Sequence, residues 1–308
     1  MSLLSRFFGL APRRVWGVPE EQVRIVFDNP TARGLLRSTH PYRSVDSIDE
    51  GGVVDSANTQ ASTLDSNAPG PNPHANLRPE ARSNQDSDNF NLRASQDTSN
   101  SPGTPAPQIH QLTIRPAWGR DHVRIEKARW QDRDWLEPWE ATIPPEANEK
   151  LPSLDEYLRQ TDAEVEAGIT LPMMIEVDGE VIGLVTAANT VRGALYSTTV
   201  GYWIISKYAG IGISSLAVAS VIDVLILKLG IHRVEINIRP ENQPSLGLAR
   251  KLKLNEEGYR PRYMHIAGEW ADHVAFAIDQ ESLPSSGLVN EIWGIPAREE
   301  FVSKGDTE

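Results

Sequence analysis

The sequence of 308 residues contains no cysteine, which excludes disulfide bonds, thiolate metal ligands and a cysteine nucleophile. Its seven histidines are scattered without the spacing of metal ligands, so we expect no metal site. A long apolar run is also missing, because the longest, at 216–229, contains Asp223 and Lys228 and is too short to cross a bilayer. The N-terminal apolar stretch is interrupted by Arg6 and is too short for a secretory signal. We therefore expect a soluble, cytoplasmic protein with no membrane partner.

Aromatic residues are scarce in the segment 44–108, where Phe90 is the only one. This segment is rich in Ser, Asn, Asp, Gly and Pro, and has nine acidic residues against three arginines. Such a composition buries too little apolar surface to offset the entropy of ordering, so we predict disorder and expect 44–107 to be dispensable for chemistry.

The preceding segment, 1–43, has the opposite charge, with seven arginines against three acidic residues. We predict a basic, partly ordered arm with one short strand at Val23–Phe27. A basic arm can bind RNA or an acidic partner through counterion release, and a solvated tail is the alternative.

Regular patterns resume at Ile109 and continue to about residue 282, which we predict to be the folded domain, followed by a C-terminal tail at 283–308. The turn Asp178-Gly179 between two apolar runs predicts a hairpin, and Ser153 with Glu156 has the spacing of a helix capping box. We expect strands at 109–117, 172–177, 181–190, 195–205 and 232–238, a closing hairpin around Ala267-Gly268, and helices at 121–135, 154–167, 213–229 and 244–252.

The centre of this domain is a strand, a glycine turn, a helix and a second strand, at 200–252. The turn contains neither the GxGxxG of dinucleotide sites nor the GxxxxGK[ST] of nucleoside triphosphate sites. It contains Lys207-x-x-Gly210-x-Gly212. Two glycines allow backbone amides to approach an anion, and the following helix adds its dipole. A tight strand-to-helix turn is the alternative interpretation.

The sequence around this turn resembles the GCN5-related N-acetyltransferases, and within them the RimJ/RimL branch that acetylates ribosomal-protein N-termini. The resemblance covers roughly residues 109–280. It implies an α/β fold with a mixed, mostly antiparallel sheet, flanking helices, and splayed central strands 4 and 5. The motifs that carry it are the glycine turn, GYWII before it, GIHRVEINIRPENQPSLGLARKL after it, EEGYRPRYMHIAGEWADHVAFAI near the end, and WLEPWEAT at Trp135–Thr142.

The resemblance also implies that acetyl-CoA binds between the splayed strands, with its pantetheine arm on strand 4 and its pyrophosphate on the glycine turn. Ser245 corresponds to the residue proposed in the family to protonate the departing thiolate, although a serine after Pro244 is also a common helix cap. The positions that the resemblance assigns to the coenzyme are Trp203, Ile204, Ile205, Lys207, Tyr208, Ala209, Gly210, Ile211, Gly212, Asn242 and Ser245.

The general base does not follow from the resemblance, because the glutamate of some relatives corresponds here to Met264. An α-amine with a pKa of about 7.7–8.0 requires little base strength, so a placed carboxylate or a water suffices. We choose Glu140, in the loop that borders the acceptor groove in this branch, while a surface carboxylate in a turn is the alternative. Tyr263 and Glu235 are weaker candidates.

The sequence therefore favours an acyltransferase that moves acetyl from acetyl-CoA to the N-terminal α-amine of a protein, most simply the alanine of a ribosomal protein. The basic arm is a candidate ribosome contact, and we expect no DNA partner. Two alternatives stay open. One is a small-amine acceptor such as an aminoglycoside or polyamine, since the acidic remainder steers any cation. The other is a non-catalytic acyl-CoA-binding module, which the loss of the family glutamate at Met264 keeps possible.

Overall fold

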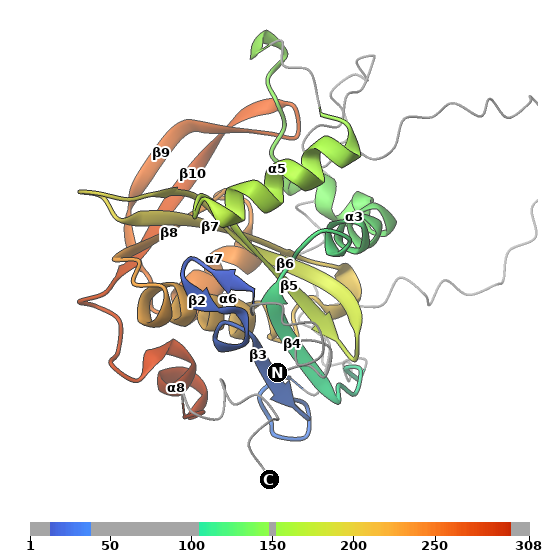
Figure 1. Ribbon diagram of the computed structural model, residues 1–308, viewed down its shortest axis with the longest axis vertical. Coiled ribbons are helices and arrows are strands. Elements are labelled where there is room, and N and C mark those ends of the chain that lie inside the picture. The colour runs from blue at the N-terminus through green and yellow to red at the C-terminus, as the bar shows by residue number, and fades with distance from the viewer. Residues whose placement is uncertain (1–12, 38–104, 148–151, 297–308) are drawn as a thin grey trace, which may run out of the picture.

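The computed structural model describes residues 13–37, 105–147 and 152–296. Its centre is a mixed sheet of eight strands in the order β3-β4-β5-β6-β7-β8-β10-β9 (Figure 1). All neighbouring pairs are antiparallel except β7 and β8, which are parallel. The bounds are β3 Ile25–Asp28, β4 Gln111–Pro116, β5 Leu171–Val177, β6 Glu180–Val191, β7 Ser197–Ile204, β8 Arg233–Ile238, β9 Asn255–Ile266 and β10 Glu269–Asp279. The expected fold class, a mixed and mostly antiparallel sheet with flanking helices, is confirmed.

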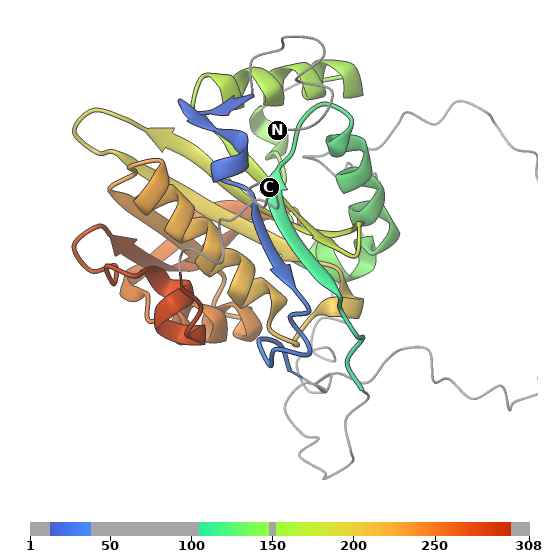
Figure 2. The ribbon, with the colours of Figure 1, turned by 60° about the horizontal axis from the view of Figure 1, so that its bottom comes forward.

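Helices cover both faces of the sheet (Figures 1 and 2). One face carries α6 (Ile213–Asp223), its π-helical continuation η5 (Val224–Lys228), α7 (Gln243–Lys251) and α8 (Gly287–Trp293) over the larger hydrophobic cluster. The other face carries α3 (Asp121–Gln131) and α5 (Leu154–Glu166). Ile125 and Ala128 of α3 pack there on Met174 and Val181, with Trp203 at the edge of the cluster.

Local patterns explain most of these elements. Asp178 and Gly179 take positive φ values of 50° and 85°, as the tight turn of hairpin β5–β6 requires. The predicted capping box is formed: Ser153 Oγ accepts from the Glu156 amide, and the Ser153 amide donates to Glu156 Oε2 at 2.8 Å. The closing hairpin β9–β10 turns at Ala267-Gly268, where φ is 49° and 92°. These three predictions are confirmed.

The helix predicted at 121–135 is wrong as one continuous element. It ends at Gln131, and two short turns follow, α4 (Arg133–Leu136) and η2 (Glu137–Trp139). Asp132 leaves helical geometry at φ −120° and ψ 30°, and its carboxylate accepts from the amide and the hydroxyl of Ser206. A tertiary contact therefore divides the helix and ties it to the segment after β7.

The packed unit is larger than the expected domain at 109–282. The arm begins with the small β1–β2 hairpin (Arg14–Val15 and Val18–Pro19) and the turn η1 (Glu20–Gln22). It then supplies β3, which pairs along β4 and confirms a strand near the predicted Val23–Phe27. The arm side chains that enter the main core are Val15, Val23, Ile25, Phe27 and Leu36.

The predicted tail also contributes a helix. Asp223 of α6 accepts the amides of Leu288 and Val289 at 2.7 and 3.0 Å, which fixes α8 against α6. Gly287 allows this approach, since a Cβ there would stand 2.6 Å from the Asp223 carboxylate. The N-terminal apolar stretch around Arg6 and the disorder predicted for 44–107 fall almost wholly outside the described residues.

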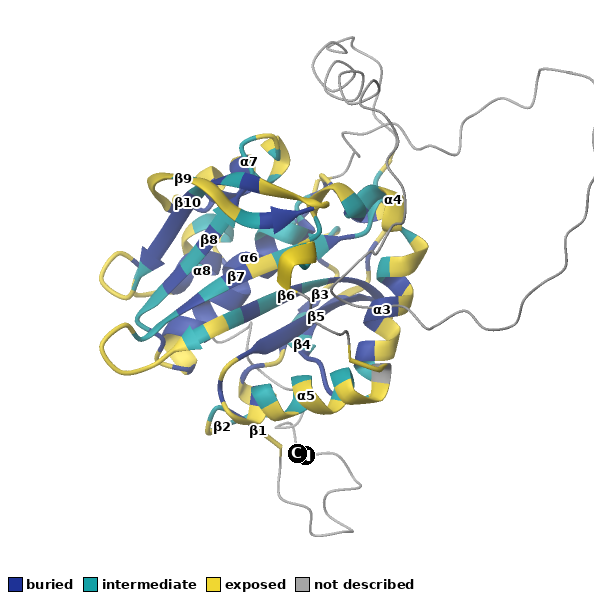
Figure 3. Cartoon of the chain, turned by 90° about the horizontal axis from the view of Figure 1, so that it is seen from above, coloured by how far each residue is buried: buried dark blue, intermediate teal, exposed yellow. Residues whose placement is uncertain are grey.

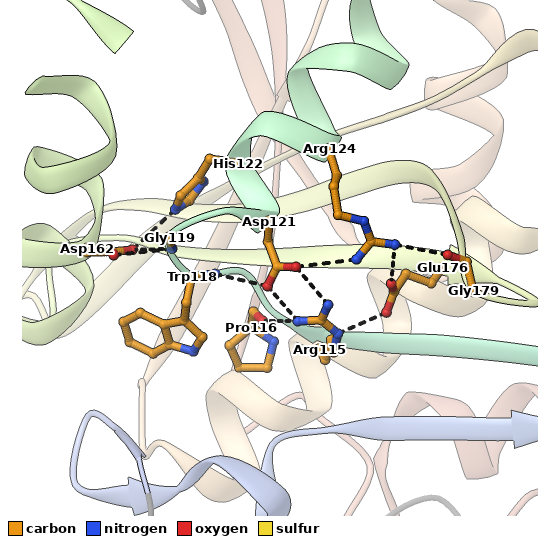
Figure 4. A network of polar contacts seen from close by, with 10 residues as sticks. All are labelled: Arg115, Pro116, Trp118, Gly119, Asp121, His122, Arg124, Asp162, Glu176 and Gly179. Carbon is orange, nitrogen blue, oxygen red and sulfur yellow. Dashed lines mark hydrogen bonds and ion pairs between the residues drawn. The ribbon is translucent and has the colours of Figure 1, made fainter. Parts of the chain in front are cut away.

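A network of charged groups holds α3 and α5 to the sheet (Figure 4). Arg115 of β4 lies between Asp121 at 2.7 Å and Glu176 of β5 at 2.9 Å, and Arg124 of α3 reaches the same two carboxylates. Asp162 of α5 accepts the Gly119 amide at 3.2 Å. Burial would raise the pKa of Asp121, but Arg115 brings that pKa below its ordinary value. These charged groups therefore stabilise the packing of the helices on the sheet.

Across the described ranges, the model contains no helix with both the length and the apolar character that a bilayer crossing requires.

Candidate functional site

The parallel strands β7 and β8 pair over only three positions. Ser197, Thr198 and Thr199 face Arg233, Val234 and Glu235, and no further pairing joins the two described strands. Beyond this point β7 stays with β6, while β8 stays with β10. The predicted splay of the central strands is therefore present, and it leaves a wedge between two facing backbone edges.

The register of β7 decides which backbone groups face the wedge. The Ile205 amide donates to Ile182 of β6 at 2.9 Å, so Trp203 and Ile205 direct their backbone groups toward β6. Because these directions alternate along a strand, the amides and carbonyls of Tyr202 and Ile204 point the other way. Trp135 Nε1 donates to the Ile204 carbonyl at 3.1 Å, which agrees with this orientation. An extended ligand can pair with the remaining groups as another strand does.

The glycine turn follows the wedge directly. A short turn, η4 (Ser206–Tyr208), leads to Gly210 and Gly212 at φ values of 78° and 103°. Such positive values favour glycine, and Gly212 is the residue from which α6 begins. Among the described residues no side chain caps this helix start, so its first amides can bind an anion.

The predicted loop residues have different surroundings. Tyr208, Ala209 and Ile211 are buried in the main core, so they can offer only backbone groups. Lys207 extends away from the helix start: its Nζ lies 3.9 Å from Glu180 of β6 and 5.0 Å from the Tyr208 ring centroid.

The start of α7 brings Ser245 to the wedge. Asn242 is the helix cap, and its Oδ1 accepts the Ser245 amide at 3.2 Å, so the cap role considered for Ser245 belongs to Asn242. Ser245 is near the hydroxyl of Tyr202, whose oxygen is buried and makes no hydrogen bond of ordinary geometry in the described structure. Burial raises the pKa of Tyr202 to about 12, and Ser245 partly offsets that rise.

Glu140 lies on the opposite face of the sheet, in the loop after η2. Its Oε1 is 2.6 Å from Arg129 Nε, and Glu126 of α3 is 3.8 Å from the same guanidinium. Burial is the main reason that the pKa of Glu126 is raised. Arg129 opposes this rise, and the negative charge of Glu140 increases it. The structure thus joins two carboxylates around one arginine, a cluster that the sequence did not indicate.

The loop that contains Glu140 is attached to the tip of hairpin β9–β10. The Ala267 amide donates to the Glu140 carbonyl, and the Thr142 amide donates to the His265 carbonyl, both at 2.9 Å. Thr142 Oγ1 accepts the Gly268 amide at 3.0 Å. Most of β9 is exposed (Figure 3), so these contacts hold an otherwise open hairpin in place.

The weaker base candidates are occupied by other contacts. Glu235 lies 3.0 Å from both Arg233 and Arg260. Burial acts to raise the pKa of Glu235, but the two guanidiniums bring it below its ordinary value. The Tyr263 hydroxyl accepts from Asn237 at 3.5 Å, and the Tyr263 ring lies 5.6 Å from that of His273. Glu235 is opposite Thr199, at the last paired position before β7 and β8 separate, but its carboxylate is held by the two arginines.

Sequence reasoning missed Tyr202 and Arg129 as parts of this region. Strand alternation in GYWII indicates that the backbone groups of Tyr202 and Ile204 point the same way, but it does not indicate which adjacent strand they face. The contact of Arg129 with Glu140 joins residues 11 positions apart through a divided helix, which no periodicity encodes.

Known proteins are similar to this chain in sequence and fold. Residues 111–255 match the family model of the acetyltransferase (GNAT) domain. The [ribosomal protein uS5]-alanine N-acetyltransferase of Escherichia coli is 29% identical over 174 residues, which cover 54% of this chain and 87% of that protein.

Two solved structures are also similar. Mycobacterium smegmatis RimJ, in complex with CoA-disulfide, is 33% identical, with 60% of this chain and 88% of that chain covered and a TM-score of 0.54. The ribosomal-protein-S5-alanine acetyltransferase of Vibrio fischeri is 25% identical, with 56% and 96% covered and a TM-score of 0.50.

Proposed function

This chain belongs to the GNAT acetyltransferase family, and from that premise we propose that it transfers the acetyl group of acetyl-CoA to the N-terminal α-amine of a protein. The acceptor class that we propose is a ribosomal protein with an N-terminal alanine, of the kind for which the Escherichia coli relative is named.

One observation carries the coenzyme part of this proposal: the wedge leads directly into the glycine turn. The Tyr202 and Ile204 amides face the wedge, and the uncapped start of α6 follows within the same chain segment. An extended pantetheine arm matches the free strand edge, since its own amides can pair with backbone groups. A pyrophosphate matches the amides at 208–212, because a helix start with glycines favours an anion.

The reaction needs no covalent enzyme intermediate. The neutral amine attacks the thioester carbonyl and a C–N bond forms. The nitrogen then gives up a proton, the C–S bond breaks, and the released thiolate of CoA takes up a proton. A backbone amide at the wedge that donates to the carbonyl oxygen would stabilise the charge that develops there. Ser245 is our candidate to hydrogen-bond and protonate the thiolate, and Tyr202 lies beside it.

Loss of the ammonium proton is the other requirement. We keep Glu140 as the candidate acceptor, by direct contact or through water. Its contact with Arg129 means that an incoming ammonium competes with a guanidinium for one carboxylate oxygen. Glu126, buried and with a raised pKa, is a second carboxylate beside the same arginine.

Ribosome contact through the basic arm is a further part of the proposal. Not every arm arginine is available for it, because Arg13 lies 4.4 Å from the Trp118 ring centroid and stacks on it. The exposed arginine Arg14 is the one to substitute in a salt-dependent ribosome sedimentation assay.

The decisive experiment offers the purified protein acetyl-CoA and four acceptors: a uS5-type peptide with N-terminal alanine, the same peptide already acetylated, spermidine and an aminoglycoside. Released thiol gives the rate, and mass spectrometry locates the acetyl group. We expect turnover with the free peptide alone. If only a small amine is acetylated, the acceptor is a small amine and not a protein N-terminus. If no acceptor is acetylated although the protein binds CoA, the result favours the non-catalytic module.

A further inference from the structure

The end of the N-terminal arm lies against the glycine turn. The Arg37 amide donates to the Ile211 carbonyl at 2.8 Å, and Leu36 is buried, 4.0 Å from where a Cβ of Gly212 would stand. Trp293 of α8 fixes the same stretch, because its Nε1 donates to the Leu35 carbonyl at 3.2 Å. Backbone and core contacts therefore set the position of Arg37 beside the turn.

A second cation lies close to Arg37. Lys251, the last residue of α7, places Nζ 4.6 Å from the Trp293 ring centroid. Partial burial lowers the pKa of Lys251, and the positive charge of Arg37 lowers it further. Within the described ranges, neither Arg37 nor Lys251 has a carboxylate at ion-pair distance. Through Trp293, which contacts both Lys251 and the stretch that ends at Arg37, two like charges lie on the same side of the turn with no described carboxylate at either, an arrangement that a bound anion stabilises.

The other basic residue of the turn does not occupy this place. Lys207 lies against Glu180 and the Tyr208 ring, on the β6 side. The amides of the turn are sufficient for a pyrophosphate, but acetyl-CoA also has a phosphate monoester on its ribose. That group is a phosphate monoester with a higher charge than either phosphate of the pyrophosphate, and side-chain cations at the flank of the turn would form strong hydrogen bonds with it.

We propose that Arg37 and Lys251 bind the ribose phosphate of acetyl-CoA, so that the N-terminal arm supplies part of the coenzyme site. The inference rests on the proposed function for its ligand. Arg37 then contacts the coenzyme, and the contacts of Leu35 and Leu36 with Trp293 and Gly212 position it. A domain that began at residue 109 would lack this half of the subsite.

The test compares two ligands, CoA and 3′-dephospho-CoA, by calorimetric titration of the full chain. The unaltered protein should bind CoA more tightly than dephospho-CoA. Arg37→Ala and Lys251→Ala should each weaken CoA binding by roughly tenfold, the size expected for a hydrogen bond to a charged group, and should leave dephospho-CoA binding unchanged. Arg37→Lys should restore part of the loss.

Two variants serve as controls. Arg24→Ala removes an exposed arm arginine beside β3, and Lys253→Ala removes a lysine that is paired with Glu291 at 3.0 Å. Both should bind the two ligands as the unaltered protein does. Arg37→Ala keeps its backbone amide and should keep the thermal midpoint.

Three results would overturn the inference. Equal losses for both ligands would show that Arg37 acts only on the shape of the turn, and no loss for CoA would show that it does not touch the coenzyme. In either case the proposed acetyl transfer stands. If the unaltered protein binds neither ligand, the coenzyme assignment fails and this subsite fails with it.

Discussion

Arg129 Nε contacts Glu140 Oε1 at 2.6 Å. Arg129 lies on α3, before the break at Asp132, and Glu140 lies in the loop after η2. The same loop is hydrogen-bonded to the tip of hairpin β9–β10 through the Glu140 carbonyl. Glu140 is therefore fixed through both its side chain and its backbone.

If Glu140 accepts the amine proton, Glu140→Gln should lower kcat by about 10²-fold at pH 7. The loss should shrink above about pH 8, where the free amine predominates. Thiol-release kinetics from pH 6.5 to 9.5 measure this, with Asp134→Asn, whose side chain is 92% exposed, as the unaffected control. A raised peptide KM with normal kcat would assign Glu140 to holding the ammonium, and normal values of both would remove it from the site.

Tyr202→Phe should separate stability from activity. Its buried hydroxyl makes no hydrogen bond of ordinary geometry among described groups, so its removal should leave the protein as stable or about 1 kcal/mol more stable. If that hydroxyl supports Ser245 at the thiolate, kcat should nevertheless fall, and Ser245→Ala should fall further with little change in KM for acetyl-CoA. Urea denaturation and initial rates measure the two effects. A destabilised Tyr202→Phe protein with normal kcat would contradict the interpretation.

Asp223 should make stability depend on pH in an unusual direction. Burial raises its pKa to about 6, although the amides of Leu288 and Val289 oppose that rise. The folded state then binds the proton more tightly than the unfolded state, so the stabilisation is complete below about pH 4 and is lost as pH rises through about 6. The contribution of Asp223 to the free energy of unfolding should be about 3 kcal/mol larger below pH 4 than at pH 7.

Asp223→Asn tests this, because an amide does not titrate. Urea midpoints at pH 4.5 and pH 7 should differ less in the variant than in the unaltered protein. Parallel pH dependence in the two proteins would show that Asp223 does not retain its proton on folding.

The arm should be required for folding, because it supplies a strand and several core residues. A protein truncated at Pro107 loses Val23, Ile25, Phe27 and Leu36, all buried in the main core. Each contributes about 1.5–3 kcal/mol, so together they approach the whole stability of a typical domain, about 5–15 kcal/mol. Circular dichroism melts should show a truncated protein that is unfolded or has a much lower Tm.

The matched variant keeps 13–37 and replaces 44–104 with a Gly/Ser linker of equal length. We expect it to melt and turn over peptide as the full chain does. Equal stability of the truncated and full proteins would contradict the contribution of β3, and a tenfold lower rate in the linker variant would show that 44–104 takes part in the chemistry.

Local sequence was sufficient for elements whose cause lies within a few residues. Asp178-Gly179 specifies its turn because both positions require positive φ, and Ser153 with Glu156 caps α5 by contacts three residues apart. The order of strand, glycine turn, helix and strand from 200 to 252 also followed from pattern alone. Because the turn directly follows the strand that lines the wedge, this order alone makes the wedge and the turn neighbours.

Tertiary structure alone decided the surroundings of that site. Asp132 divides a helix because it meets Ser206, Arg129 meets Glu140 across that division, and Arg37 reaches Ile211 from the far end of the arm. Each contact joins residues that come together only when the sheet and its helices pack. Backbone periodicity reports which side of an element is apolar, but the partner of a charged or polar side chain depends on distances that only the packed fold fixes.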